Sequence, residues 1–215
     1  MKQGLFTAVV LSVLAGATTV CDFQPTGSSG NSRGAVVFSP GDFGATAFSV
    51  ELVDRISEIE YSFSAEVYTI DDPGNQLKNG IIPGDTMTGI VRYTSGAGNE
   101  SANPQFGNHH HRSGAYGLYA RINGLVFCTD TTAPDVEVLI DNEAYRFAVS
   151  SYNNFPGNTS GQINEMVFEL QAEAGFEDAR LPYSLLPLSS LESGTFNIRA
   201  EAFSISAGII TLKRS

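Results

Sequence analysis

A strict alternation of apolar and polar residues constrains the fold of this chain more than any other feature. Between Ile59 and Val67 every odd position is apolar and every even position is Glu or Ser. Successive side chains of a β-strand point to opposite faces, so this pattern predicts a strand with one buried and one solvated face. Similar apolar spacing predicts further strands at residues 86–94, 116–122, 125–129, 135–140, 145–149, 166–172, 196–202 and 209–212.

Turn residues separate these segments. Asn123-Gly124 lies between two apolar runs and predicts a tight hairpin, because both turn positions need a positive φ. Asp141-Asn142-Glu143 predicts a second hairpin. With a short strand at Ala35–Phe38, about nine to ten strands follow one another along the chain. The prediction is an all-β fold, a single antiparallel β-sandwich of jelly-roll-like form.

The N-terminus has the pattern of an export signal. Residues 1–17 contain one Lys, an apolar run from Leu5 to Leu14 and small residues ending in Ala15-Gly16-Ala17. This is typical of a cleaved signal peptide, since the apolar run is short for a membrane span. We expect a flexible linker at 18–34, rich in Gly and Ser, and one β-sandwich domain at 35–215. The domain is expected to be secreted or otherwise extracytoplasmic, in the periplasm or at the cell surface, with no membrane span after signal removal.

Composition limits the kinds of binding partner that are expected for this chain. Apolar residues make up 42% of the chain, enough for a packed core, and the net charge is −11. A surface of this sign repels phosphate backbones and anionic membranes, so nucleic acid is not an expected partner.

The two cysteines, Cys21 and Cys128, leave three alternatives open. In an oxidising compartment they are candidates for a disulfide. Cys128 follows an apolar run and could instead be a buried thiol. Cys21 also lies near the expected cleavage site, where a lipid anchor is a third alternative, although Thr18-Thr19-Val20 before it fits that modification poorly.

One segment resembles a known family. Residues 82–93 read IPGDTMTGIVRY, within a longer match that covers about residues 60–212. This pattern is similar to uncharacterised exported bacterial domains often found with a PEP-CTERM sorting tail. The resemblance implies an exported β-sandwich with no established activity, in which Asp85 and Gly89 are structural residues. The chain departs from the better-known members because it lacks the sorting tail, which argues against anchoring by that route.

A polar stretch from Ser95 to Gly114 is predicted to be an exposed loop, because it shows no apolar period. It contains the three histidines of the chain. In an extended segment His109 and His111 would project to the same side as a candidate metal pair. The simpler alternative is a polar loop whose imidazoles are solvated.

Carboxylates near strand ends are candidate calcium ligands, chiefly Asp130, Asp135 and Asp141. No known calcium-loop spacing is present, and Asp is also a favoured turn residue. Calcium is therefore the one candidate cofactor, and no other cofactor is expected.

Function follows only in outline. No nucleophile motif or metal signature is strong, so we expect a non-catalytic binding or structural module of the cell envelope or extracellular matrix. Glycans or other envelope proteins are the expected partners. One alternative is a secreted glycan-acting hydrolase, which would need two carboxylates from the set Glu60, Glu66, Glu137, Glu165 and Glu169. Another is a self-associating surface subunit. Tyr68, Tyr119 and Tyr152 are candidates for stacking on sugars, or simply partial core.

Overall fold

The computed structural model describes residues 58–78, 80–155, 162–173, 181–182 and 188–214, and this part of the chain is almost entirely β-structure. The expected all-β, antiparallel fold is confirmed. The only helical element described is the short 3₁₀ turn η1 (Leu188–Ser190). The strands are β1 (Glu58–Asp71), β2 (Thr86–Thr94), β3 (Phe106–His111), β4 (Gly117–Ile122), β5 (Leu125–Thr129), β6 (Val136–Asp141), β7 (Arg146–Ser151), β8 (Asn154–Phe155), β9 (Ile163–Ala172), β10 (Leu191–Ala200) and β11 (Ser204–Arg214).

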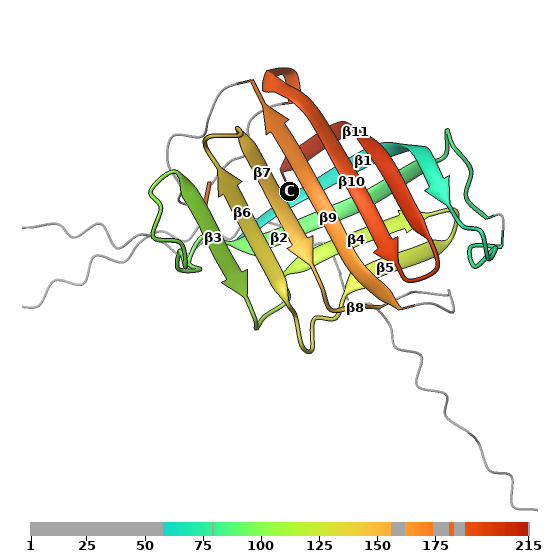
Figure 1. Ribbon diagram of the computed structural model, residues 1–215, viewed down its shortest axis with the longest axis horizontal. Helices are drawn as coiled ribbons and strands as arrows, with labels where there is room; N and C mark the ends of the chain where they lie inside the picture. Colours follow the sequence, from blue (N-terminus) through green and yellow to red (C-terminus); the bar gives the residue numbers. More distant parts are fainter. Residues whose placement is uncertain (1–57, 79, 156–161, 174–180, 183–187, 215) are drawn as a thin grey trace, which may run out of the picture.

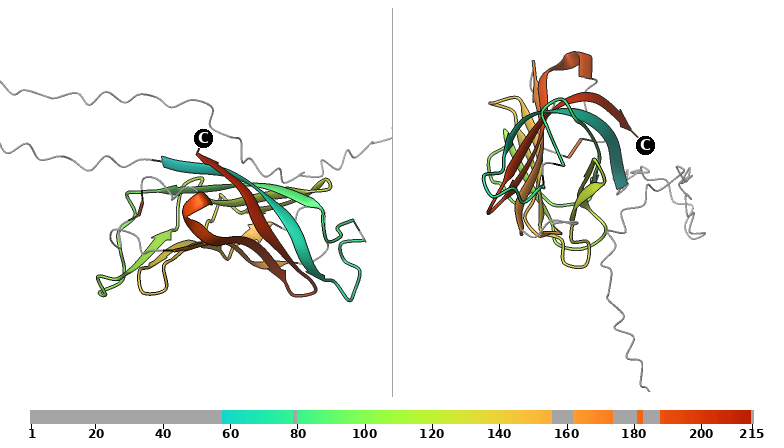
Figure 2. Two further views of the ribbon diagram at one scale, coloured as in Figure 1. Left: turned by 90° about the horizontal axis from the view of Figure 1, so that it is seen from above. Right: turned by 90° about the vertical axis from the view of Figure 1, so that its right-hand side faces the viewer.

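All eleven strands belong to one continuous antiparallel ladder, in the order β10-β11-β1-β2-β4-β5-β8-β9-β7-β6-β3. Strand β9 also pairs with β10, so the order of pairing closes on itself, and β7, β6 and β3 extend from β9. Figure 1 shows β3, β6, β7, β9 and β10 in front of β1, β2, β4 and β5. The views in Figure 2 show the same two groups as facing layers, a sandwich-like arrangement.

The core lies between these two layers. Along β1 the odd residues from Ile59 to Val67 are buried, as the alternation predicts. Aromatic rings join the layers, because Phe63 of β1 packs against Phe168 of β9 and Phe196 of β10, with ring centroids 5.5 and 5.0 Å apart. Each fully buried side chain of this size contributes about 1.5–3 kcal/mol relative to exposure. Burial of the alternating apolar face therefore drives the two layers together.

A buried polar network holds the junction where β5 of one layer meets β7 of the other. Thr129 Oγ1 lies 2.7 Å from Ser151 Oγ, and Ser151 Oγ donates to Asn154 Oδ1 at 2.6 Å. The Leu118 N–H donates to Thr129 Oγ1 at 2.9 Å, which ties β4 into the same network. All three polar side chains are buried, and their mutual hydrogen bonds remove the cost of burying them.

Two turns behave as predicted. Asn123 and Gly124 both have positive φ, 47° and 84°, and join β4 to β5 as a tight hairpin. Asp85 is structural, because its Oδ2 accepts hydrogen bonds from Ile82 N and Asn123 Nδ2, both at 2.7 Å. Gly84, with φ of 93°, completes the turn before β2. The turn at 82–85 thus fixes the start of β2 and its register beside β1.

The strand count differs from the expected nine to ten. Strand β3 lies inside the segment predicted to be a long loop, and β8 is a two-residue strand without a visible period. Tyr145, expected in a strand, instead sits in the β6–β7 turn with φ of 53°. The expected signal peptide at 1–17, the linker at 18–34 and the strand at 35–38 lie outside the described residues. A single continuous ladder replaces two separately paired sheets.

Candidate functional site

His109 and His111 do project to the same side, but that side faces the interior. Both are 3% exposed on β3, so the prediction of an exposed loop is wrong for this segment. His109 Nδ1 lies 2.9 Å from Ala97 O, and His111 Nε2 accepts a hydrogen bond from Thr94 N at 3.1 Å. Burial lowers the pKa of His111 below its ordinary value of 6.5, because the charged imidazolium loses its hydration. These two imidazoles serve the backbone of the segment that precedes β3.

The three candidate aspartates are turn residues. Asp130 accepts hydrogen bonds from Thr132 N and Oγ1, and Asp141 accepts from Glu143 N and Ala144 N. Asp135 is exposed before β6. Among the described residues, no group of three or more His, Cys, Asp and Glu side chains could hold a metal ion. The structure therefore does not bring the five predicted metal ligands together, and the carboxylates of Asp130 and Asp141 cap local backbone instead.

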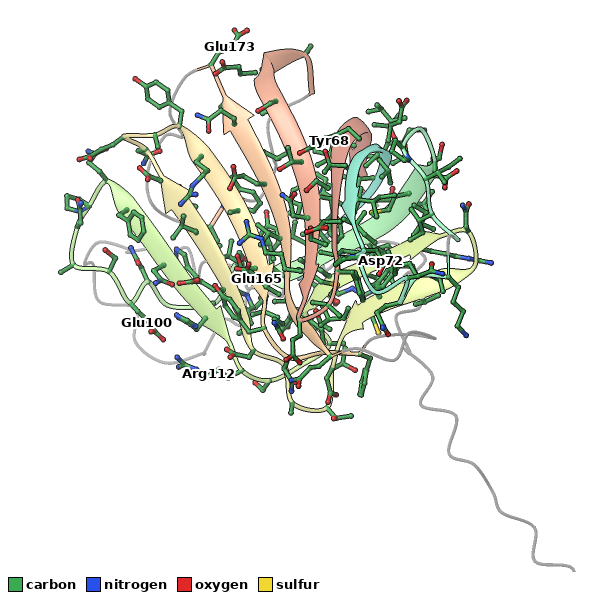
Figure 3. The ribbon with its side chains drawn as sticks, turned by 45° about the vertical axis from the view of Figure 1, so that its right-hand side comes forward. Tyr68, Asp72, Glu100, Arg112, Glu165 and Glu173 are labelled. Atoms are coloured by element: carbon green, nitrogen blue, oxygen red, sulfur yellow. The ribbon has the colours of Figure 1, made fainter. Side chains whose placement is uncertain are left out.

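His110 points the opposite way from its neighbours, onto the outer face of the front layer. Its Nε2 lies 3.8 Å from Glu100 Oε2 and 3.7 Å from Glu137 Oε1. Tyr152 donates a hydrogen bond to Glu137 at 3.0 Å, and partial burial together with this bond raises the pKa of Tyr152. Glu100 also pairs with Arg112, and Figure 3 shows these two side chains beside β3, far from Tyr68 and Asp72. Each carboxylate here already has a local partner.

A groove lies on the outer face of the back layer, across β11, β1, β2 and β4. It encloses about 400 Å³ and is open to solvent. Most of the residues that line it carry a hydroxyl group. The others are one cation, one aliphatic residue, one phenylalanine and one glycine. The lining residues are Ser62, Phe63, Ser64, Thr88, Gly89, Ile90, Tyr119, Thr211 and Lys213. No Asp or Glu occurs among these described lining residues.

The register of the ladder explains this composition. One cross-strand row on the outer face consists of Lys213, Ser62, Ile90, Tyr119 and Cys128. Cross-strand neighbours share a face of the sheet, so their side chains project together. The next row contributes the remaining hydroxyls, from Thr211, Ser64 and Thr88. Ser64 Oγ lies 2.6 Å from Thr211 Oγ1, which joins β1 and β11 within the groove.

Gly89 allows the core side chain Phe63 to pack closely against β2 beneath the groove. A Cβ at this position would lie 2.2 Å from Phe63 Cζ and 2.5 Å from Tyr119 O. The Phe63 ring therefore packs directly over the β2 backbone, where any other residue would hold it away. Gly89 is therefore a structural residue of β2.

A buried ion pair lies in the row on the other side of Ser62 and Ile90. Glu60 of β1 and Arg92 of β2 are direct cross-strand partners, 6% and 3% exposed. Arg92 Nε donates to Glu60 Oε2 at 2.9 Å, and Arg92 Nη2 approaches the same oxygen more closely. Glu58 Oε1 lies 3.4 Å from Arg92 Nε. Sequence alternation placed Glu60 on a solvated face, whereas the structure buries it with its partner.

Of the three candidate sugar-stacking tyrosines, only Tyr119 lines the groove. Tyr68, at the far end of β1, is 55% exposed, and Tyr152 lies on the other layer. The remaining groove residues were missed because Ser and Thr at alternate positions are typical of any solvated strand face. Ile90 was the available signal, since it is an apolar residue on the polar side of its strand.

Cys128 lies beside Tyr119 in the same cross-strand row and is fully buried. It is not a free thiol, and the part of the chain that the structure describes contains no other cysteine. Cys21, its candidate partner, lies outside the described residues. The alternative of a buried free thiol at Cys128 is therefore wrong.

Comparison with known proteins returns no relative. No protein family, curated protein or solved structure matches the chain. Within the described residues, no helix is long and apolar enough to cross a membrane.

Proposed function

We propose that this protein is an exported, non-catalytic module that binds carbohydrate in the groove across β11, β1, β2 and β4. The observation that carries the proposal is the lining of the groove, which includes four aliphatic hydroxyls and one tyrosine: Ser62, Ser64, Thr88, Thr211 and Tyr119. Sugars offer hydroxyls for hydrogen bonding and apolar ring faces for stacking on aromatic side chains. A concave, mixed surface of this kind is typical of small-molecule sites.

The lack of carboxylates among the described residues that line the groove favours binding over hydrolysis. Glycoside hydrolysis uses two carboxyl groups about 5–9.5 Å apart on either side of the scissile bond. The described lining of the groove supplies none. On the opposite layer Glu165 pairs with Arg199, and Glu169 with Arg146, so these acids neutralise arginines on the solvated face. The glycan-acting hydrolase therefore remains the weaker alternative.

Export is part of the proposal. A signal peptide at 1–17 would deliver the chain to an oxidising compartment, where Cys21 and Cys128 form a disulfide. The absence of a free thiol at Cys128 supports this pairing. A Cys21 sulfur bonded to Cys128 cannot also carry a lipid, so intact-mass measurement of the secreted protein distinguishes the two. The proposal expects a chain cleaved after Ala17 and lighter by two hydrogen atoms than its reduced form, and a lipid adduct would contradict it.

Titration of the purified domain with a panel of oligosaccharides tests the groove. Tyr119→Ala is expected to lower affinity by about tenfold, equivalent to about 1.4 kcal/mol, whereas Tyr119→Phe keeps the stacking ring and most of the affinity. Tyr145→Ala is a matched control, because Tyr145 is an exposed tyrosine in a turn of the other layer. Failure of the intact protein to bind any saccharide, or unchanged affinity in Tyr119→Ala, would refute the proposal.

A second candidate function is self-association through β11. Strand β10 pairs with β11 only at residues 204–208, while β1 pairs with it as far as Arg214. No described strand pairs with the other edge of residues 209–214, and unprotected edges are templates for pairing with another chain. The free edge of β3, by contrast, is covered, because Glu100 N donates to Asn108 O and Asn108 N donates to the Asn99 side chain.

Sedimentation over a range of concentrations tests this candidate. Reversible dimers are expected, and they should be lost in Ile210→Lys, which places a charge on an exposed position of the open edge. A monomer at every concentration would exclude it.

A further inference from the structure

We infer that the groove selects anionic polysaccharides, those carrying carboxylate or sulfate groups, over neutral ones. This inference rests on the proposed carbohydrate function and adds the charge of the ligand. The chain as a whole has a net charge of −11. Among the described residues that line the groove, however, the one charged side chain is that of Lys213, a cation. A second cation, Arg121 of β4, is the cross-strand partner of Thr88 and shares the outer face with it.

Lys213 and Arg121 have no acidic partner among the described residues, a property that they share with Arg214, the next residue of β11. Lys213 and Arg121 are both exposed, and neither forms an ion pair within the described parts of the chain. Four arginines elsewhere each pair with a glutamate: Arg92, Arg112, Arg146 and Arg199. An acidic protein that leaves two cations unpaired at one groove offers a local positive potential there.

The acidic residues nearest in the ladder are the buried Glu60 and the exposed Glu66. Glu60, on one side of the groove, is buried and held by Arg92. Glu66, on the other side, is the cross-strand partner of Thr86, beyond the row that contains Thr88. The hydroxyls of Ser64 and Thr88 therefore lie between the two cations with no carboxylate among them.

The spacing of the cations indicates a polymer. Lys213 lies on β11 and Arg121 on β4, with β1 and β2 between them. Three inter-strand steps of about 4.8 Å separate the two backbones by about 14 Å. A chain of several sugars lying across the strands would pass over the intervening hydroxyls and reach both side chains. Acidic groups repeated along such a chain would meet both cations.

Paired polymers separate charge from sugar shape. Polygalacturonate and its fully methyl-esterified form differ in carboxylates, and dextran sulfate and dextran differ in sulfates. Affinity electrophoresis of the full domain in gels containing each polymer gives its dissociation constant. We expect retardation by one or both acidic polymers and at least about tenfold weaker binding of the neutral counterpart; the two acidic arms identify carboxylate or sulfate as the group preferred. Binding should also weaken with added salt, because exposed charges are screened.

Variants then locate the effect. Lys213→Gln combined with Arg121→Gln should weaken binding of the acidic polymer about five- to tenfold, as expected for two solvent-exposed ion pairs. Lys78→Gln combined with Arg112→Gln is the matched control, since it removes the same two charges from exposed positions outside the groove and should change binding less than twofold.

Each remaining outcome is decisive. Equal binding of neutral and acidic polymers that still depends on Tyr119 would overturn the inference and leave the proposed function standing. An equal loss in the groove and control variants would overturn it in favour of a nonspecific charge effect. No retardation by any polymer, and none of the oligosaccharides bound, would overturn the inference together with the function on which it rests.

Discussion

Replacement of Arg92 by Met is expected to destabilise the fold by about 3–5 kcal/mol. The magnitude follows from the environment of Glu60, which is 6% exposed and relies on Arg92 for its neutralisation. Glu60 Oε1 is buried without a hydrogen-bond partner among the described residues, so the carboxylate already has incomplete compensation. Removing one member of a buried ion pair leaves an uncompensated charge, which costs far more than the pair itself contributes. Loss of the 3.4 Å contact to the half-exposed Glu58 adds little.

A double variant separates the unpaired charge from lost packing. Glu60→Leu with Arg92→Met removes both charges and should recover most of the stability lost in the single variant, because an apolar pair often replaces a buried ion pair without net cost. Urea unfolding monitored by circular dichroism gives each free energy of unfolding, with slopes compared to confirm a single transition. A cost below about 1 kcal/mol for Arg92→Met, or a double variant no more stable than Arg92→Met, would contradict the dependence of Glu60 on Arg92.

Two further perturbations test other parts of the structure. Burial lowers the pKa of His111, so as the pH falls the unfolded chain binds a proton at this residue before the folded chain does. The stability that His111 contributes is therefore present above about pH 6.5 and is lost as the pH falls below that value. The urea midpoint should fall less steeply with decreasing pH in His111→Gln than in the unmodified protein, and the same pH dependence in both proteins would contradict the assignment. Gly89→Ala places a Cβ 2.2 Å from the Phe63 ring and should cost about 1–3 kcal/mol or more. Gly208→Ala is its control, since nothing lies within 4 Å of its Cβ, and equal thermal stability of the two variants would contradict the close packing.

Most of the fold follows from local pattern. The strand predicted at residues 86–94 coincides with β2, and the predicted alternations of β1 and β9 match their buried faces. Asn123-Gly124 joins its two strands with both residues at positive φ, as its chemistry requires. The order of the strands in the ladder does not follow from local pattern. Strand β1 pairs with β11 from the far end of the chain, and no short-range signal specifies such a partner.

Strand β3 shows where composition misled the prediction. After Phe106 its residues are Gly, Asn and His, which resemble a polar loop, yet Gly107, His109 and His111 alternate into the interior. One ring nitrogen of each buried imidazole meets the backbone of Ala97 or Thr94, and these backbone groups become available only after the preceding segment folds beside β3. A polar side chain with its partner in place can occupy a core position, and sequence alone does not reveal the partner.

The groove was hidden for a related reason. Tyr119 was a candidate for sugar stacking, but Ser62, Thr88 and Lys213 were indistinguishable from ordinary solvated strand positions. Their convergence depends on the register of four strands. Long-range pairing therefore creates the site, and its chemistry becomes recognisable only once the rows of the sheet are known.

Amide chemical-shift changes during titration with an oligosaccharide locate the binding surface residue by residue. Titration of the isotope-labelled domain with an acidic oligosaccharide of four or more sugars is expected to shift amides on β1, β2, β4 and β11, centred on Ser62, Thr88, Tyr119 and Thr211. Shifts centred instead on the layer that carries His110 and Glu137, or no shifts at millimolar ligand, would contradict carbohydrate binding in this groove.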